Sequence, residues 1–360
     1  MSIANQQLVE STIAAVQTIS PQSIDDAVAF HSTLTKPAGS LGRLEDIGAA
    51  LCGIQQQIPP VVERTQVVVF AADHGITKSH SLGPFPREVT VQMVHNFLAG
   101  GAAINAIANV VEAEFAAVDM GVDGDLSAIE SDLFHSHCIA KGTNDISTGP
   151  AMNDEQLYAA MAAGITMAEH CFDQGCAAVA LGEMGIGNTT IASAVTAALL
   201  KLPPEHITGR GTGADDGTLA RKIDAIKQAI AVNNADPANG FDVLKKLGGF
   251  ELAGIAGISI GLARRRIAVV ADGFISTAAV LAAVRMCPSL KGYVFCGHQS
   301  TEPGHQFLLE ALERKPLLDL DCRLGEGTGA CLSLALLKSS AAIMSQMATF
   351  DSAGVEDKSS

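Results

Sequence analysis

The sequence is poor in aromatic and in basic side chains. It has no tryptophan and only two tyrosines, and 38 aspartates and glutamates outnumber 23 lysines and arginines, which gives a formal net charge of −15 at pH 7. A charge of this sign argues against nucleic acid or an anionic membrane surface as a partner. A small phosphorylated substrate stays compatible with it, because a few cationic groups can dominate the potential inside a pocket.

Three kinds of segment are also missing. The eight cysteines contain no Cys-x-x-Cys pair, and their spacings resemble neither a zinc site nor a disulfide framework. We therefore expect reduced thiols and a cytoplasmic location. The N-terminus lacks the basic start and the apolar core of a signal peptide. We also find no apolar run long enough to cross a bilayer and expect no membrane span.

One glycine-rich segment, Leu181–Thr190, has the composition of a binding turn. It lies between an apolar run typical of a buried strand, 177–181, and one typical of a buried helix, 191–200. A strand, a glycine turn and a helix N-terminus favour anion binding, because backbone N–H groups meet the anion at the positive end of the helix dipole. Glu183 in this turn would repel a phosphate, so we expect the phosphate to bind beside a place where chemistry occurs.

A second turn of the same kind lies near the other end of the chain. Arg323–Ala330 contains another Leu-Gly-Glu and sits between a predicted strand, 317–321, and an apolar helix that starts at Cys331. In an open parallel sheet such turns lie at the carboxyl ends of the strands, where ligands bind. The sequence therefore predicts that Glu183 and Glu326 can face one pocket.

Short apolar runs alternate with helical periodicity along the chain, which is typical of a parallel sheet. The expected strands are residues 66–72, 114–119, 177–181, 267–271, 293–296 and 317–321. We predict an α/β fold, with a six-stranded, mainly parallel, Rossmann-like sheet flanked by helices and a small helical domain formed by both termini. The α/β nucleotide-binding catalytic domain is expected at 61–325, and the helical domain at 1–60 plus about 326–360. Residues 120–150 are polar without a clear period, so we expect a loop there.

Other segments suggest chemistry, but each has a plain structural alternative. Gly209–Gly213 resembles a dinucleotide-binding pattern, yet no strand precedes it, so we reject that site and keep a loop that could close over a phosphate. Lys222, on the following helix, is either a phosphate ligand or a surface lysine. Asp73 and His74 follow a strand and are either a base or metal ligand or a pair that stiffens the loop. Phe134–Cys138 lacks further ligands at a spacing suited to a metal site.

A series of short stretches carries a resemblance to a known family. They are Lys36–Glu45, Phe70–Gly75, Phe85–Met93 with Gly100–Asn105, Gly182–Thr190, Gly209–Gly213 with Asp215-Asp216, Asp272–Ile275, His298–His305 and Arg323–Ala330. In this order and at these intervals the chain closely resembles the nicotinate-nucleotide–dimethylbenzimidazole phosphoribosyltransferases. The departures from the family pattern, at Ala38, Gly297 and Cys322, are conservative.

This resemblance implies an enzyme that transfers the phosphoribosyl group of nicotinate mononucleotide to 5,6-dimethylbenzimidazole, with inversion at the anomeric carbon. The products would be nicotinate and α-ribazole 5′-phosphate, a step of cobalamin biosynthesis. The resemblance also implies a homodimer whose partners are these small-molecule substrates and which needs no metal or redox cofactor.

The same resemblance implies roles for individual residues. Glu326 is expected to be the general base, and Glu183 a supporting carboxylate near the ribose or the anomeric carbon. The residues expected to bind the phosphate and ribose are Gly185, Gly187, Asn188, Thr189, Thr190, Arg210, Gly211, Thr212, Gly213 and Lys222. The residues expected to form an apolar slot for the acceptor base, each of which could equally be core packing, are Phe85, Pro86, Met93, Met184 and Leu324.

Three alternatives stay open. The same chemistry could use another acceptor, such as adenine or a phenolic base, because the slot residues do not discriminate between acceptors. A nucleotide-dependent dehydrogenase would need a strand-anchored glycine fingerprint with a downstream acidic residue, which is missing. A non-catalytic nucleotide-binding regulator would bind tightly without turnover, and two intact Gly-Glu turns argue against it.

Overall fold

The computed structural model describes residues 3–211 and 213–356. Its centre is a six-stranded sheet in the order β3-β2-β1-β4-β5-β6, in which every neighbouring pair is parallel. The strands are β1 (Arg64–Ala72), β2 (Glu114–Gly121), β3 (Phe134–Ser136), β4 (Cys176–Met184), β5 (Ala268–Ala271) and β6 (Val294–Cys296). The strand order reverses between β1 and β4, and doubly wound sheets bind ligands at such a point. The predicted α/β class with a parallel, Rossmann-like sheet is confirmed.

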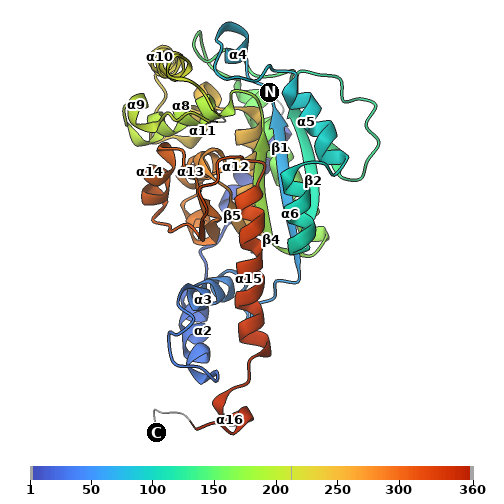
Figure 1. Cartoon of the computed structure of the whole chain (residues 1–360), viewed down its shortest axis with the longest axis vertical. Helices are drawn as coiled ribbons and strands as arrows, with labels where there is room; N and C mark the ends of the chain where they lie inside the picture. The colour runs from blue at the N-terminus through green and yellow to red at the C-terminus, as the bar shows by residue number, and fades with distance from the viewer. Residues whose placement is uncertain (1–2, 212, 357–360) are drawn as a thin grey trace.

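Helices cover both faces of this sheet (Figure 1). They are α1 (Ile3–Ala15), α2 (Pro21–Thr33), α3 (Arg43–Gln55), α4 (Ile76–Ser79), α5 (Val89–Leu98), α6 (Ala103–Val111), α7 (Asp154–Asp173), α8 (Asn188–Leu200), α9 (Pro204–Ile207), α10 (Asp216–Asn233), α11 (Gly240–Leu247), α12 (Phe250–Arg264), α13 (Phe274–Met286), α14 (Gly304–Leu312), α15 (Thr328–Gln346) and α16 (Phe350–Ala353), with a 3₁₀ turn at Pro288–Tyr293. In Figure 1, α6 and α15 lie in front of the sheet and α12 lies behind it. α12 packs on β1, β2, β4 and β5, and α15 packs on β1, β4 and β5.

The two central strands hold the first predicted glutamate in place. All of β1 after Arg64 is buried, as expected for a strand covered on both faces. β4 pairs with β1 in a register that sets Phe70 opposite Glu183 and Ala71 opposite Met184. Glu183 therefore stands at the carboxyl end of a central strand, next to the point where the strand order reverses.

The membership of the sheet differs from the prediction at both edges. The segment predicted as the sixth strand, 317–321, contributes only β8 (Leu318–Asp319), which pairs with β7 (His298–Gln299) in a separate two-stranded sheet. Pro316 just before it has no N–H to donate, and Asp319 is exposed, so the segment cannot extend as a buried strand. The actual sixth strand is β3, inside the stretch predicted as a loop, where three half-exposed residues gave no clear period.

The expectation that no apolar run is long enough to cross a bilayer is wrong. Two segments are long and apolar enough, Val89–Val111 and Thr328–Gln346, each with a mean hydropathy of 1.3, and this criterion considers only length and composition. The first consists of α5 and α6, which are separated around Gly100 and Gly101. The second is α15, which packs against α3, α6 and the central strands. Packed core helices share this length and composition.

Helices from the two ends of the chain meet at the lower end of the molecule in Figure 1. α2 packs on α3, α3 packs on α15, and a single antiparallel bridge joins Leu34 to Thr349. α1 instead packs on α7 and α12 of the α/β region. The division into domains at 1–60 plus 326–360 and at 61–325 stays a prediction, and these contacts associate α1 with the larger part.

Candidate active site

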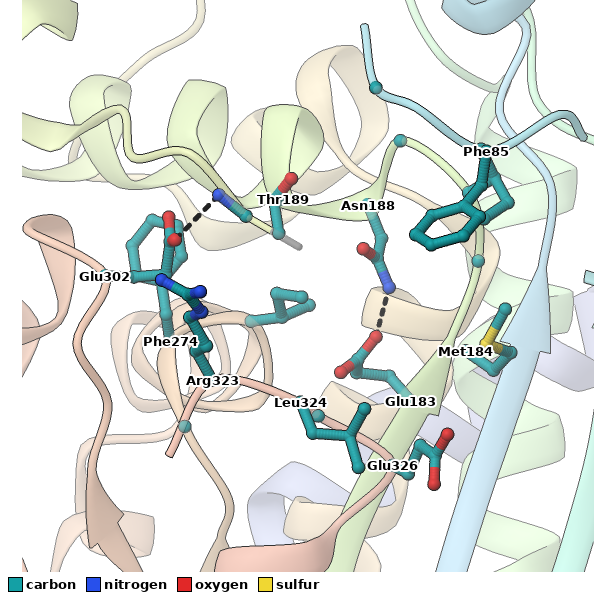
Figure 2. Close-up of a pocket in the computed structure, with 18 of the residues that line it drawn as sticks. Phe85, Glu183, Met184, Asn188, Thr189, Phe274, Glu302, Arg323, Leu324 and Glu326 are labelled. Carbon is teal, nitrogen blue, oxygen red and sulfur yellow. Dashed lines mark hydrogen bonds between the residues drawn. The ribbon is translucent and has the colours of Figure 1, made fainter. Parts of the chain in front are cut away.

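A cavity of about 310 Å³ opens at the carboxyl ends of the central strands. Several parts of the chain line it: the loop before α5 and the start of that helix, the turn from β4 to α8, residues 210–211 with Lys222 of α10, the start of α13, residues 298–302, and residues 323–326 ahead of α15. Figure 2 shows Glu183 and Glu326 at its base, Phe85 and Met184 on one side and Glu302 on the other. A volume of this size accommodates a small organic ligand.

The first Leu-Gly-Glu turn places a buried carboxylate in the cavity. Glu183 is 4% exposed, and its Oε2 accepts a hydrogen bond from the side-chain amide of Asn188, drawn as a dashed line in Figure 2. Burial raises the pKa of Glu183 well above its usual value, and the nearby carboxylates of Asp272, Glu251 and Glu326 raise it further. A carboxylate held near other carboxylates in a dry site is suited to meet positive charge on a ligand.

The second Leu-Gly-Glu turn has an unusual backbone. Gly325, Glu326 and Gly327 have φ values of 88°, 62° and 81°, so three consecutive residues lie in the left-handed region. A non-glycine residue there costs about 1–3 kcal/mol and persists only where its surroundings hold it. Burial raises the pKa of Glu326, the Asp272 carboxylate adds to this, and the backbone N–H of Ile104 opposes it. The Oε2 atom of Glu326 has no hydrogen-bond partner within the described residues.

The two turns touch each other through their glycines. A Cβ atom on Gly182 would lie 2.6 Å from the carbonyl oxygen of Glu326, and one on Gly327 would lie 3.0 Å from the Cα atom of Gly182. A Cβ on Gly325 would lie 2.4 Å from Oε1 of Glu183. Only glycine allows this approach, so the backbone contact fixes the two glutamates relative to each other.

A buried lysine also lines the cavity. Lys222 of α10 is 1% exposed, and its Nζ donates to Thr189 Oγ1 at 3.2 Å and to the Gly209 carbonyl at 3.0 Å. Burial lowers the pKa of this ammonium, and the Glu302 carboxylate opposes the shift. Glu302 Oε1 accepts the N–H of Gly211 at 2.8 Å, which ties the glycine loop to Glu302. The N-terminus of α8 and a cation thus converge on one spot, as an anion requires.

Asp272 and His298 are among the polar residues of the site that received no role from the sequence. Asp272, at the end of β5, accepts the N–H of Ala330 at 2.8 Å and so caps the start of α15. Its Oδ1 lies 3.6 Å from Nε2 of His298, and both side chains are buried. Asp272 follows a strand, as Asp73 does, and this strand-end signal was available in the sequence. The sequence did not indicate that Asp272 caps α15, because that helix starts far along the chain.

Apolar side chains form the remaining wall of the cavity. Phe85, Met93, Met184 and Leu324 all line it, and Phe85 and Leu324 are 50% and 51% exposed. Pro86 does not line it and borders a neighbouring, more polar cavity instead. Large apolar side chains left exposed around a cavity are the usual surface of a ligand slot.

The structure brings most of the predicted site residues together, and their individual roles stay predictions. Those that line the cavity are Phe85, Met93, Glu183, Met184, Gly185, Gly187, Asn188, Thr189, Arg210, Gly211, Lys222, Leu324 and Glu326. Thr190 is buried inside α8 and Gly213 lies outside the lining, so neither reaches the cavity, and Thr212 lies outside the described residues. The lining residues without a predicted role include Asp272, Phe274, His298, Ser300, Glu302 and Arg323.

The fold and this site define a phosphoribosyltransferase, and the model of a phosphoribosyltransferase family matches residues 16–355. The chain belongs to the family of nicotinate-nucleotide–dimethylbenzimidazole phosphoribosyltransferases. A relative of that name from Geobacter metallireducens is 46% identical over 97% of this chain and 98% of its own. Another, from Chloroflexus aggregans, is 46% identical over 98% of this chain and 99% of its own.

A solved structure agrees with the sequence relatives. The crystal structure of the enzyme of the same name from Thermus thermophilus has a TM-score of 0.88 and 41% sequence identity to this chain. The match covers 94% of this chain and all of the solved one, at 100%. The family expected from the sequence motifs is confirmed, and with it the enzyme class.

Proposed function

We propose that the protein transfers the phosphoribosyl group of nicotinate mononucleotide to 5,6-dimethylbenzimidazole and releases nicotinate and α-ribazole 5′-phosphate. The relatives named for this reaction match nearly the whole chain. The observation that carries the proposal is one cavity lined by two buried glutamates, a buried lysine and a set of apolar side chains. These parts correspond to a reacting centre, a phosphate and a flat apolar base.

The reaction needs one bond to form and one to break. A ring nitrogen of the neutral benzimidazole forms a bond to the anomeric carbon, while the bond from that carbon to the pyridinium nitrogen breaks and nicotinate takes the electron pair. The second benzimidazole nitrogen then carries an acidic proton, which Glu326 accepts. A base of raised pKa is better suited to this transfer than an exposed glutamate, provided that it is ionised.

The remaining predicted roles follow from the position of each group. Glu183 would stabilise positive charge at the anomeric carbon, since its carboxylate and that of Glu326 both lie at the base of the cavity (Figure 2). Lys222, Gly211 and the start of α8 would hold the 5′-phosphate. Phe85 and Leu324 would enclose the acceptor base. Holding both reactants in line supplies much of the acceleration, since nicotinate is already a good leaving group.

The reaction is tested by a competition assay. We would incubate the protein with nicotinate mononucleotide and equal amounts of dimethylbenzimidazole, adenine and p-cresol, and follow all products by mass spectrometry. We expect α-ribazole 5′-phosphate to dominate, with nicotinate released in equal amount. Release of nicotinate with another glycosylated base would keep the chemistry and change the acceptor. If folded protein releases no nicotinate, the proposed transfer reaction is wrong and a non-catalytic nucleotide-binding regulator is favoured.

The lysine is tested by replacing its charge and keeping its shape. We expect Lys222→Met to raise the KM for nicotinate mononucleotide by about 10-fold or more, because a charge-assisted hydrogen bond to the phosphate is lost. Lys227→Met is a matched control, since Lys227 lies on the same helix but is 49% exposed and pairs with Glu205. An unchanged KM in Lys222→Met would contradict the phosphate role.

We further propose that the enzyme works as a cytoplasmic homodimer on small-molecule substrates only. Reduced thiols support the compartment, because all eight cysteines are free. The acidic net charge of −15 supports the absence of nucleic-acid partners. Sedimentation of the purified protein would report the oligomeric state directly.

A further inference from the structure

One buried hydroxyl joins two walls of the cavity. Thr90, the second residue of α5, is 0% exposed. Its Oγ1 donates to Asp73 Oδ1 at 2.9 Å and accepts the backbone N–H of Ile186 at 3.1 Å. Asp73 is itself held at the end of β1, because its Oδ2 accepts the N–H of Asp123 at 2.8 Å. A single atom therefore connects the end of β1, the start of α5 and the turn from β4 to α8.

The two elements that meet at Thr90 belong to different parts of the site. α5 contributes Val89 and Met93 to the apolar wall. Ile186 is the middle of the Gly185–Gly187 turn, which lines the cavity and leads into the N-terminus of α8. The same turn abuts β1, since a Cβ atom on Gly185 would lie 2.2 Å from the carbonyl oxygen of Ala72. The hydrogen bond from Ile186 to Thr90 therefore links α5 directly to this turn.

The chemistry at this position requires a hydroxyl. A hydroxyl donates and accepts at the same time, whereas a carboxylate only accepts and an ammonium only donates. Asp73 Oδ1 needs a donor and the Ile186 N–H needs an acceptor, and Thr90 satisfies both. Because Thr90 is fully buried, loss of its hydroxyl leaves both groups without a partner, which costs more than a typical surface hydrogen bond.

We infer that Thr90 is a positioning residue that couples binding in the acceptor slot to binding at the Gly185–Gly187 turn. This inference rests on the proposed function, in which the slot takes the acceptor base and the turn takes the ribose phosphate. Thr90 does not line the cavity. Occupation of the slot fixes α5, α5 fixes Thr90, and Thr90 fixes the Ile186 N–H and with it the turn. Coupling of this kind is reciprocal, so each ligand tightens the other by the same factor.

The test uses ligands that bind but do not react. Ribose 5-phosphate carries the phosphate and ribose without a leaving group, so its affinity and that of dimethylbenzimidazole can be measured by calorimetry, singly and together. We expect each to tighten the other several-fold in the wild type. Thr90→Val keeps the shape of the side chain but removes the hydroxyl. We expect it to abolish this coupling and to lower the affinity for ribose 5-phosphate about 10-fold. Thr90→Ser keeps the hydroxyl and should retain both.

The outcomes separate this inference from the proposed function. If Thr90→Val leaves both the coupling and the ribose 5-phosphate affinity unchanged, the inference about Thr90 is wrong. A lower melting temperature would not rescue it, because that result indicates a merely structural role. The inference is also wrong if the wild type binds both ligands and neither changes the affinity for the other. A wild type that binds ribose 5-phosphate but not dimethylbenzimidazole contradicts only the proposed acceptor, and the ribose 5-phosphate affinities of the two variants still decide the role of Thr90. Thr90→Ala replaces Thr90→Val if the latter does not fold.

Discussion

Replacing the carboxylate of Glu326 by an amide should reduce kcat by about 10²–10⁴-fold, the usual contribution of a general base. Glu326→Gln keeps the size and shape of the side chain but removes its negative charge and its ability to take a proton. We expect KM for nicotinate mononucleotide to stay nearly constant, because the proposed phosphate contacts lie at Lys222 and not at Glu326. Steady-state kinetics with dimethylbenzimidazole measure both quantities.

A matched control separates chemistry from backbone strain. Glu112 has the same left-handed conformation, with φ of 54° against 62° for Glu326, but it is exposed and lies at the end of α6. Glu112→Gln should leave kcat and the melting temperature unchanged. Near-normal turnover of folded Glu326→Gln would show that Glu326 is not the base.

The proposed base also sets the expected sign of the pH dependence. In that role Glu326 would act in its ionised form, and burial raises its pKa above the usual value of 4.5. The rate therefore falls as the pH drops, and the fall begins at a higher pH than for an exposed glutamate. Because the charge of Glu326 also raises the pKa of Glu183, the acidic limb of kcat/KM belongs to the pair of carboxylates.

Glu183→Gln should lower kcat by about 10²–10³-fold, the range found when one preorganised electrostatic partner of a transition state is removed. This variant should also become more stable at neutral and alkaline pH. The charged form of Glu183 is disfavoured by burial and by three neighbouring carboxylates, Asp272, Glu251 and Glu326. A glutamine removes that charge and can still accept the amide hydrogen bond of Asn188.

The sign of this stability effect follows from linkage. The pKa of Glu183 is raised in the folded state, so its contribution is most favourable below the unfolded pKa and is lost as the pH rises through the folded pKa. Glutamine resembles the protonated form at every pH. The melting temperature of Glu183→Gln should therefore exceed that of the wild type at pH 8, and the gap should close toward pH 4. A gap that widens toward acid would contradict the burial argument.

Local sequence patterns were sufficient to predict a strand where that strand is apolar and covered by helices on both faces. β1 and β4 are continuous buried runs, so their existence and their ends could be predicted to within a few residues. β3 could not, because an edge strand of two partly buried residues and one exposed residue carries no period. The prediction of a strand at Leu317 was wrong for the opposite reason. The segment resembles a strand locally, but only two of its residues pair, and they pair with β7 outside the large sheet.

The site shows the same division between local and tertiary information. The two Leu-Gly-Glu turns are visible in the sequence because glycine and glutamate are unusual together between a strand and a helix. The burial of Lys222 is not visible, since its partners Thr189 and Gly209 come from other segments. The Asp73–Thr90–Ile186 connection depends entirely on how three distant segments pack.

The backbone contact between the two glycine turns has a consequence for how the catalytic geometry arises during folding. Residues 64–296 contain every strand of the large sheet, so a growing chain could complete that sheet before residue 326 is available. Gly182 would then face empty space in place of the Glu326 carbonyl, and the Glu183 side chain would lack the neighbour that confines it. We therefore expect the two glutamates to reach their final arrangement only after the turn at Gly325–Gly327 has packed against Gly182.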